Sequence, residues 1–383
     1  MDKPTVQDIF HRFYPAYLDQ YSPSPVQAKV AHNIMNCKTG AYGANVCVCE
    51  DCGFVQIHYN SCRNRCCPMC QAVPKEMWMD ARREDVLDAP YFHLVFTVPD
   101  ILNPVIYSNQ RLLYDALYHA ASSTISELTA DPKHLGAKVG YICILHTWGS
   151  EMNFHPHIHT ILLGGGLASN NQWKDNGENF FLPIRVISKM FRGKYLEELK
   201  RLWEEDKLVF HGTAEKFRNH YTFKELLDSC YGMDWIPHCK KTFNGAQTVI
   251  KYLGKYTHRI AVNNHRIVRM DDDTVTFLVK DYRNEGQWKE LTISGVEFVR
   301  RFLMHVPPRR FVRIRHYGLL CSRTKSQKLT LCRNLLGCKK YLSKLRDMEM
   351  PEILEHLYGI KVCVCKACGG HLGKPQMRMP LRC

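Results

Sequence analysis

Three histidines separated by single residues offer the clearest chemistry in the sequence. His155, His157 and His159 alternate with Pro156 and Ile158. Alternate side chains of a β-strand point to the same face, so His157 and His159 are expected to lie side by side. Two neighbouring imidazoles suit a divalent metal that keeps open positions for a substrate. The spacing therefore predicts a metal site, and the alternative is a group of partly buried histidines without a metal.

A third metal ligand is expected from the preceding strand, which the pattern places at residues 139–147. Its short connection to the histidine strand favours an antiparallel hairpin. If the turn centres near Glu151, His146 lies across from His157 on the same face and is the first candidate. Weaker candidates are Glu151, Asn153 and Gln247. A zinc hydrolase is an alternative for such a site, but the helical His-Glu-x-x-His signature is absent.

Two tyrosines four residues apart form a second group with reactive potential. Tyr252 and Tyr256 fall in a predicted helix at 245–258, where this spacing places them on one face. On spacing alone, two packing aromatics would explain them. Their neighbours, however, are cations that hold a phosphate and favour a phenolate, namely Lys251, Lys255, His258 and Arg259. A tyrosine can attack a phosphodiester and keep the bond energy as a phosphotyrosine ester, without ATP.

Six of the 18 cysteines form three Cys-x-x-Cys pairs. We expect a chain that is not exported, in which such pairs indicate thiolates on zinc. One structural zinc site is predicted from two such pairs, Cys49, Cys52, Cys67 and Cys70. A second, interleaved site is predicted from His32, Cys37, Cys62 and Cys66, with Cys47 as a competing ligand. Four protein ligands leave no open position, so neither site is expected to be catalytic.

A further knuckle near the end of the sequence lacks a clear partner pair. It consists of Cys365 and Cys368 followed by His371, with Cys363 and Cys383 nearby. A zinc ion at this knuckle is therefore an open alternative, and the expected zinc content is one or two ions, with three as the upper bound.

The elements expected around these residues form an antiparallel α+β domain. Strands are predicted at 91–98, 139–147, 157–163 and 311–316, and a hairpin at 274–280 and 287–293. Helices are predicted at 104–129, 188–206, 214–229 and 294–305, after two short helices within 1–36 and a polar one at 74–87. The predicted regions are a zinc module at 1–85, a central domain at 86–262, a β-rich extension at 263–320 and a basic, Cys-containing tail at 321–383.

The charge of the chain indicates a polyanionic partner. There are 52 Lys and Arg against 37 Asp and Glu, a net charge of +15, and phosphate contacts would release counterions. Solubility alone is the other interpretation of the surplus. An expected path for a DNA backbone runs over Arg309, Arg310, Arg313 and Arg315, although a solvated basic edge strand would explain these residues equally well. No apolar run is long enough to span a membrane, so we expect a cytoplasmic, nucleoid-associated protein.

Taken together, six segments resemble the HUH-type rolling-circle transposases with two tyrosines, the IS91-like insertion-sequence family. They are 59–65 with the second cysteine pair, 155–159 with 164–167, 191–195, 252–259, 294–298 and 311–318. They follow the family order from about residue 30 to residue 320, and their joint occurrence is far more specific than any one of them. Two positions depart from the family pattern: Cys66 stands where His is usual, and Ser150 where Gln is common.

The resemblance implies an HUH nuclease fold, an antiparallel sheet backed by helices, with the tyrosine helix beside the histidine strand. It implies that His157 and His159 bind Mg²⁺ or Mn²⁺ and that Tyr252 and Tyr256 are the nucleophiles. The product would be a 5′-phosphotyrosine ester and a free 3′-OH on single-stranded DNA, with the zinc segment helping to recognise the element ends. The expected function is therefore a DNA transposase.

Three other functions compete with this interpretation. A plasmid replication initiator or conjugative relaxase would use the same chemistry, and the DNA next to the gene would distinguish them. A non-enzymatic zinc-finger regulator explains the charge and the cysteines but leaves the histidines and tyrosines without a role. A transposase with an acidic metal triad is the third alternative, and the sequence shows no readable triad.

Overall fold

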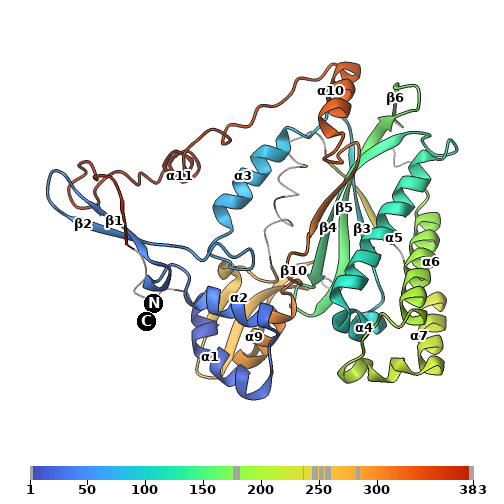
Figure 1. The fold of residues 1–383 in the computed structure, drawn as a ribbon, viewed down its shortest axis with the longest axis horizontal. Coiled ribbons are helices and arrows are strands. Elements are labelled where there is room, and N and C mark those ends of the chain that lie inside the picture. The colour runs from blue at the N-terminus through green and yellow to red at the C-terminus, as the bar shows by residue number, and fades with distance from the viewer. Residues whose placement is uncertain are drawn as a thin grey trace.

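The computed structural model describes residues 3–175, 182–235, 237–243, 249, 254, 260–281 and 285–378. Several residues named above lie outside these ranges, namely Gln247, Lys251, Tyr252, Lys255, Tyr256, His258, Arg259 and Cys383. The described chain combines helices with three antiparallel sheets, which confirms the predicted α+β class (Figure 1). Among the described residues, none of the helices combines the length and apolarity needed to span a bilayer.

The largest sheet is six-stranded and antiparallel, with the order β11-β4-β5-β3-β7 and β6 paired to β5. Its strands are β3 (Tyr91–Thr97), β4 (Lys138–Trp148), β5 (Phe154–Leu167), β6 (Trp173–Asp175), β7 (His238–Phe243) and β11 (Ile314–Gly318). The predicted hairpin of the second and third strands is confirmed by the pairing of β4 with β5. β5 is buried along most of its length because it lies between β3 and β4.

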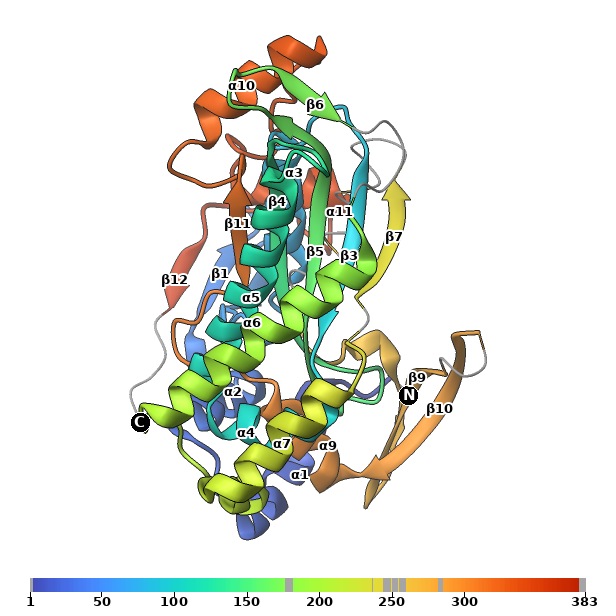
Figure 2. The ribbon, with the colours of Figure 1, turned by 90° about the vertical axis from the view of Figure 1, so that its right-hand side faces the viewer.

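The two faces of this sheet are covered differently. On one face, Ile158 and Leu162 of β5 join an apolar cluster with α5 (Gln110–Ala130) and α6 (Ile184–Glu204). Figure 2 shows both helices lying across this face, with α7 (His220–Gly232) beside them. On the other face, Ile161 and Leu163 join a smaller cluster with Met79 of α3 (Ala72–Arg83). The alternation of β5 places His157 and His159 on this second face.

A second sheet, β8 (Ile267–Met270), β9 (Thr274–Asp281) and β10 (Gln287–Ser294), packs with the N-terminal helices. One apolar cluster joins it to α1 (Val6–Gln20), α2 (Pro25–Met35) and α9 (Gly295–Met304). α1 and α9 approach so closely that a Cβ at Gly295 would overlap the ring of Phe13. The predicted regions 1–85 and 263–320 therefore share a core.

The third sheet is small and brings the two ends of the chain together. β1 (Ala44–Val48) pairs with β2 (Val55–Tyr59) on one side and with β12 (Gln376–Arg378) on the other. In Figure 1 the β1–β2 hairpin extends away from the main sheet. Between β11 and β12 lie α10 (Lys325–Leu336) and α11 (Met350–Tyr358), so the predicted tail contributes a strand to the N-terminal module.

Two predicted helices differ from those observed. The helix expected at 104–129 is divided into α4 (Asn103–Ser108) and α5 at Asn109, whose φ of −125° is not helical. The Asn109 amide donates to the carbonyls of Val105 and Val209, which fixes this break. The helix expected at 214–229 begins instead as the 3₁₀ helix Gly212–Arg218, and α7 starts after Asn219, whose side chain caps it.

Candidate active site on the histidine face

Three histidines converge on the second face of the main sheet, which we call the histidine face. The register pairs His146 of β4 with His157 of β5, which confirms their predicted opposition. A ring nitrogen of each of His146, His157 and His159 lies within 4.8 Å of the others, and all three side chains are buried. Glu151 and Asn153, the weaker candidates that the structure describes, are exposed in the turn and lie outside this group.

Hydrogen bonds orient two of the three rings. His157 Nδ1 lies 2.7 Å from the carbonyl of His155, so it donates there and leaves Nε2 as an acceptor. His159 Nδ1 lies 2.9 Å from Nε2 of His93, a buried residue of β3. The Nε2 atoms of His157 and His159 are then 3.0 Å apart. Two metal bonds of about 2.1 Å that meet at a right angle place their ligand atoms about 3 Å apart, so the donor set fits a divalent cation.

Burial also favours the protonation state that binds metal. It lowers the pKa of His157 to about 3, with the neighbouring His155 as the second cause. The pKa of His159 is lowered well below its usual value, first by burial and then by His146. A neutral imidazole is the form that coordinates a metal, so these rings can bind one without losing a proton.

The two predicted DNA-binding arginines at and just before β11 have different surroundings. The guanidinium of Arg313 lies 5.5 Å from the ring of Trp148, which stacks on His146 with ring centroids 4.4 Å apart. Arg315 instead forms an ion pair with Asp115 of α5 and lies 3.9 Å from the ring of Tyr118. The charge of Arg315 is thus paired within the protein, on the helical side of the sheet.

The segment that carries the two tyrosines is described at Val249 and Gly254. Val249 is buried in the apolar cluster of the histidine face, together with Ile161 and Leu163. Gly254 lies so close to α3 that a Cβ there would overlap Met79. Of this segment, Val249 therefore contacts the face on which the histidines lie, and Gly254 contacts α3.

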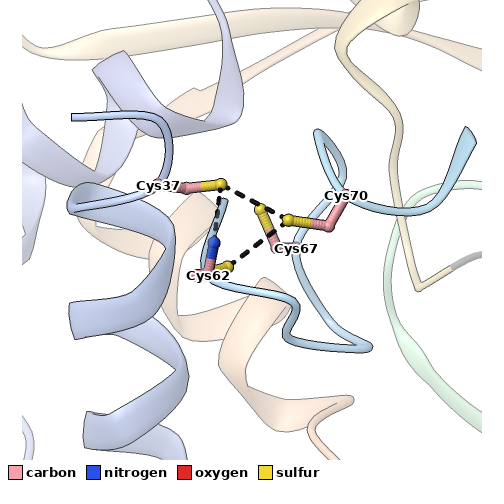
Figure 3. Close-up of side chains that lie close together, drawn as sticks. All are labelled: Cys37, Cys62, Cys67 and Cys70. Atoms are coloured by element: carbon pink, nitrogen blue, oxygen red, sulfur yellow. Dashed lines mark hydrogen bonds between the residues drawn. The ribbon is translucent and has the colours of Figure 1, made fainter. Parts of the chain in front are cut away.

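A group of four cysteines lies at the base of the β1–β2 hairpin (Figure 3). It consists of Cys37, Cys62, Cys67 and Cys70, whose sulfur atoms all lie within 4.8 Å of one another. The Sγ of Cys70 is 3.4 Å from that of Cys37 and 3.5 Å from that of Cys62. Four sulfurs on a tetrahedral zinc with bonds of about 2.3 Å lie roughly 3.8 Å apart, so this group fits a closed zinc site.

The predicted grouping of the cysteines is wrong. Cys49 and Cys52 lie beyond the far end of the hairpin and meet Cys365 and Cys368, whereas Cys67 and Cys70 remain at its base. The five residues of β1 span roughly 17 Å at about 3.4 Å per residue, which is too far for one metal to bind both pairs.

Three other predicted zinc ligands are not in either cysteine group. His32 is exposed on α2, and its ring contacts the amide of Asn36. Cys66 is buried, and its pKa is raised to about 11 by that burial, so it is a thiol in the core. Cys47, the competing ligand, is a buried residue of β1 that packs with Cys49, Cys365 and Leu372. Cys66, which stands where the family usually has histidine, thus belongs to none of the candidate ligand groups among the described residues.

The structure also contains an arginine groove that the sequence interpretation found only in part, since it named Arg310 and Arg313 but neither Arg63 nor Arg65. The groove has a volume of about 530 Å³. It lies between residues 63–74, which follow β2, and residues 310–314 at the start of β11. Its cationic lining residues are Arg63, Arg65, Arg310 and Arg313. Arg65 also donates to the carbonyl of Phe311, so it holds the two walls together. The Arg-x-Arg pattern of Arg63 and Arg65, directly before Cys66 and Cys67, could have indicated this groove.

Comparisons with known proteins now define the class. A family model described as "Putative transposase" matches residues 140–328, and one described as "Transposase zinc-binding domain", of IS91 type, matches residues 9–98. The chain is thus a transposase with an N-terminal zinc-binding domain.

Two relatives place it more closely. The putative transposase y4qJ of Sinorhizobium fredii (strain NBRC 101917 / NGR234) is 40% identical over 369 residues, covering 95% of this chain and 93% of the relative. The transposase for insertion sequence element IS801 of Pseudomonas savastanoi pv. phaseolicola is 30% identical over 309 residues, covering 79% and 72%. The chain belongs to the IS91-like transposase family, as the motifs predicted.

Solved structures add little to this assignment. The metal-free complex of the conjugative relaxase TrwC with oriT DNA covers 43% of this chain and 71% of its own, at 13% identity and a TM-score of 0.24. The metal-bound complex covers 43% and 69%, at 14% identity and the same TM-score. Scores of this size do not establish a shared fold.

Proposed function

We propose that this transposase nicks and rejoins single-stranded DNA at the ends of its element through a covalent tyrosine–DNA ester, and so drives rolling-circle transposition. One observation carries the proposal. Three buried imidazoles converge on the face of the sheet that Val249, from the tyrosine segment, also contacts. The segment whose sequence contains the candidate nucleophiles thus contributes Val249 to the side of the domain that carries the candidate metal centre.

His146, His157 and His159 would hold a divalent cation, Mg²⁺ or Mn²⁺. When bound, such a cation polarises the scissile phosphate and offsets its developing charge. Imidazole nitrogen prefers transition-metal ions, so we expect Mn²⁺ to bind more tightly than Mg²⁺. With three protein ligands among the described residues, the centre would leave coordination positions for phosphate oxygens and water, unlike the four-cysteine sites.

The nucleophiles in this proposal are Tyr252 and Tyr256. The phenolic oxygen loses its proton to solvent and attacks phosphorus, forming an O–P bond while the P–O3′ bond breaks. The leaving oxygen takes a proton and becomes a free 3′-OH, and the phosphate stays esterified to tyrosine on the 5′ side. Attack by a 3′-OH on this ester reverses the step and rejoins DNA. No external energy source is needed, because each step exchanges one phosphoester for another.

The arginine groove is the proposed approach for the DNA strand. Arg63 and Arg310 are exposed on its two walls. Arg313 connects the groove to Trp148, which stacks on His146 of the metal centre. Phosphates bound along this line would position the strand without reading its sequence, whereas recognition of the element ends is assigned to the zinc module.

This proposal keeps the central domain at 86–262 as the nuclease, the zinc module at 1–85 as the part that recognises DNA, and 263–320 as an extension of the nuclease. The tail at 321–383 completes the zinc module through β12. A chromosomal DNA substrate implies a cytoplasmic, nucleoid-associated location.

The test uses labelled single-stranded oligonucleotides from both flanks of the gene, with a randomised pool as a further substrate. Purified protein is incubated with Mn²⁺ or Mg²⁺, or with EDTA, and adducts that survive SDS are counted. The proposal expects an adduct only with metal. Binding without an adduct on every substrate, including the randomised pool, would contradict the covalent mechanism.

A further inference from the structure

Two cysteine knuckles from opposite ends of the chain face each other at the tip of the β1–β2 hairpin. The sulfurs of Cys49, Cys52, Cys365 and Cys368 all lie within 4.8 Å of one another. Sγ of Cys49 is 3.5 Å from Sγ of Cys368, and Sγ of Cys52 is 3.8 Å from Sγ of Cys365. These separations are far longer than the bond of about 2.05 Å in a disulfide and close to the spacing of thiolates around one metal.

The two knuckles have the same local structure. Each has the sequence Cys-x-x-Cys-Gly, and its glycine, Gly53 or Gly369, has a φ of +70° or +77°. The amide of each glycine donates to the carbonyl of the first cysteine, at 3.0 Å in both turns. Only glycine adopts this left-handed conformation without strain, so each turn is specified by its own sequence.

Backbone amides also point at the sulfurs of the C-terminal knuckle. The amide of Ala367 lies 3.4 Å from Sγ of Cys365, and the amide of Gly370 lies 3.4 Å from Sγ of Cys368. Such donors stabilise thiolates, the form that binds metal. In each pair one cysteine is buried and the other exposed, so an ion between them would be enclosed by protein on one side only.

We propose that these four cysteines bind a second structural zinc ion, which fastens the C-terminal segment to the N-terminal module. The site is bipartite, because Cys52 and Cys365 are 313 residues apart in the sequence. Both family models end before residue 329, so the C-terminal half of the site lies outside them. Zinc suits the donor set, since four thiolates give a closed tetrahedral site without redox chemistry.

Backbone pairing around the site shows what the ion would hold. The carbonyl of His371 accepts from the amide of Glu50 at 3.0 Å, and Val48 accepts from Gly373 at 2.9 Å. β12 then continues the sheet alongside β1. Few apolar side chains support this contact, since the cluster beneath it contains only Cys47, Cys49, Cys365 and Leu372 among the described residues. Bonds to zinc would therefore supply the stability that the small core lacks.

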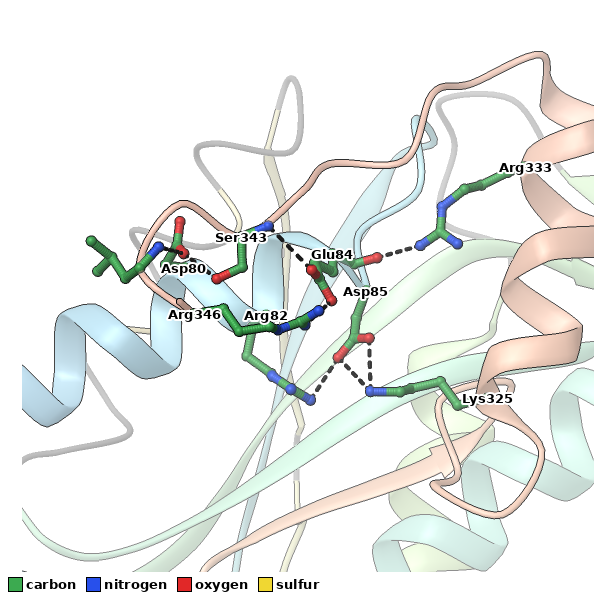
Figure 4. Close-up of polar contacts among 9 residues, drawn as sticks. Asp80, Arg82, Glu84, Asp85, Lys325, Arg333, Ser343 and Arg346 are labelled. Carbon is green, nitrogen blue, oxygen red and sulfur yellow. Dashed lines mark hydrogen bonds and ion pairs between the residues drawn. The ribbon is translucent and has the colours of Figure 1, made fainter. Parts of the chain in front are cut away.

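A second attachment of the same segment lies at α3 (Figure 4). The buried carboxylate of Asp80 accepts from the hydroxyl of Tyr341 at 2.7 Å and from the amide of Leu345 at 3.0 Å. Asp85 pairs with Lys325 at 2.8 Å. This attachment is independent of the cysteines, so losing the zinc should release residues 361–378 and leave 325–346 in place.

The test measures metal in the full-length protein, purified under reducing conditions, by mass spectrometry of the elements. A His157→Ala background reduces binding at the histidine centre, and a chelating gel removes loosely held ions. We expect two zinc ions per chain, one in Cys365→Ser, and two in Cys363→Ser, the matched control two residues away. Hydrogen exchange should rise at 361–378 in Cys365→Ser and remain low at 341–346.

Cys368→His keeps the test valid if the serine variant misfolds. With Co²⁺ in place of zinc, this variant should retain two ions and show weaker sulfur-to-cobalt absorption. One zinc in both the parent and Cys365→Ser would overturn the proposal, as would an intact mass four hydrogens short, which indicates two disulfides. The readout is metal content, so failure of the proposed nuclease chemistry would not change it.

Discussion

The histidine centre and the site formed by Cys37, Cys62, Cys67 and Cys70 both gather their side chains from separate parts of the chain. The backbone that positions these side chains differs between the two sites. His146 and His157 face each other across two long strands whose register is fixed by ladder hydrogen bonds and by the apolar cluster beneath. Cys37, Cys62, Cys67 and Cys70 lie on turns and loops around a short hairpin. The sheet therefore positions the histidines before any metal binds, whereas we expect the cysteine loops to depend on zinc for part of their order.

The two sites also differ in the number and type of their candidate ligands. Three imidazoles leave room for a substrate, and four thiolates do not. Under the proposed function, the chain would use one kind of metal site for chemistry and another for folding. Each of the following predictions separates these two roles.

The largest effect is expected from breaking the cysteine site. Cys67→Ser removes a ligand from a site whose zinc contributes on the order of 10 kcal/mol to folding in comparable small modules. Hydrogen exchange should lose protection across residues 37–70, while β4 and β5 remain protected. Equal protection of residues 37–70 from hydrogen exchange in Cys67→Ser and the parent would contradict the proposed dependence on metal.

The next effect is on catalysis without a change in fold. His157→Ala should lower the rate of adduct formation on the order of 100-fold, about 3 kcal/mol of lost stabilisation of the phosphate. Zinc content and thermal unfolding should stay close to those of the parent, because the sheet does not need the metal. His119→Ala, an exposed histidine of α5, is the control and should change neither.

A smaller effect is expected from His93, which contacts the candidate metal centre through His159. His93→Ala leaves Nδ1 of His159 without this partner, and loss of such a supporting bond weakens metal binding by about 10- to 100-fold. Titration with Mn²⁺ measures this affinity directly. His93→Gln, which can restore the bond, should recover part of it. If both variants bind Mn²⁺ like the parent, His93 does not position His159.

The smallest effect concerns the arginine groove. Arg63→Ala and Arg310→Ala should each weaken binding of single-stranded DNA by a few-fold and reduce the dependence of log affinity on log salt by about 1. Lys224→Ala removes the same charge from α7, where the lysine pairs with Asp228, and is the control. An equal loss in all three variants would show that only net charge matters.

Local patterns in the sequence predicted the strands β3, β4, β5 and β11 of the main sheet and its histidines, but not β6 or β7. β3, β4 and β5 are long apolar runs ended by proline or glycine, and the alternation of His157 with His159 sets their shared face. The position of His146 followed from the short turn between two strands. The break at Asn109 could not be predicted, because it depends on a hydrogen bond to Val209, 100 residues away.

The cysteine partners could not be assigned from the sequence for the same reason. Spacing identified the Cys-x-x-Cys pairs, but the hairpin that separates Cys49 from Cys67 was not predicted, and the partner of Cys49 lies at the other end of the chain. His93 was missed because a single histidine in the apolar strand 91–98 gives no periodic signal. Such contacts are fixed by tertiary structure.

The most direct test of the proposed chemistry is to identify the residue that carries DNA. Adducts formed with Mn²⁺ are digested, and the peptide bearing a nucleotide phosphate is sequenced by mass spectrometry. The account predicts a 5′-phosphate on Tyr252 or Tyr256, a reduced adduct in either Tyr→Phe variant and none in the double variant, with Tyr221→Phe unaffected. A phosphate on any other residue, or an adduct that persists in the double variant, would contradict it.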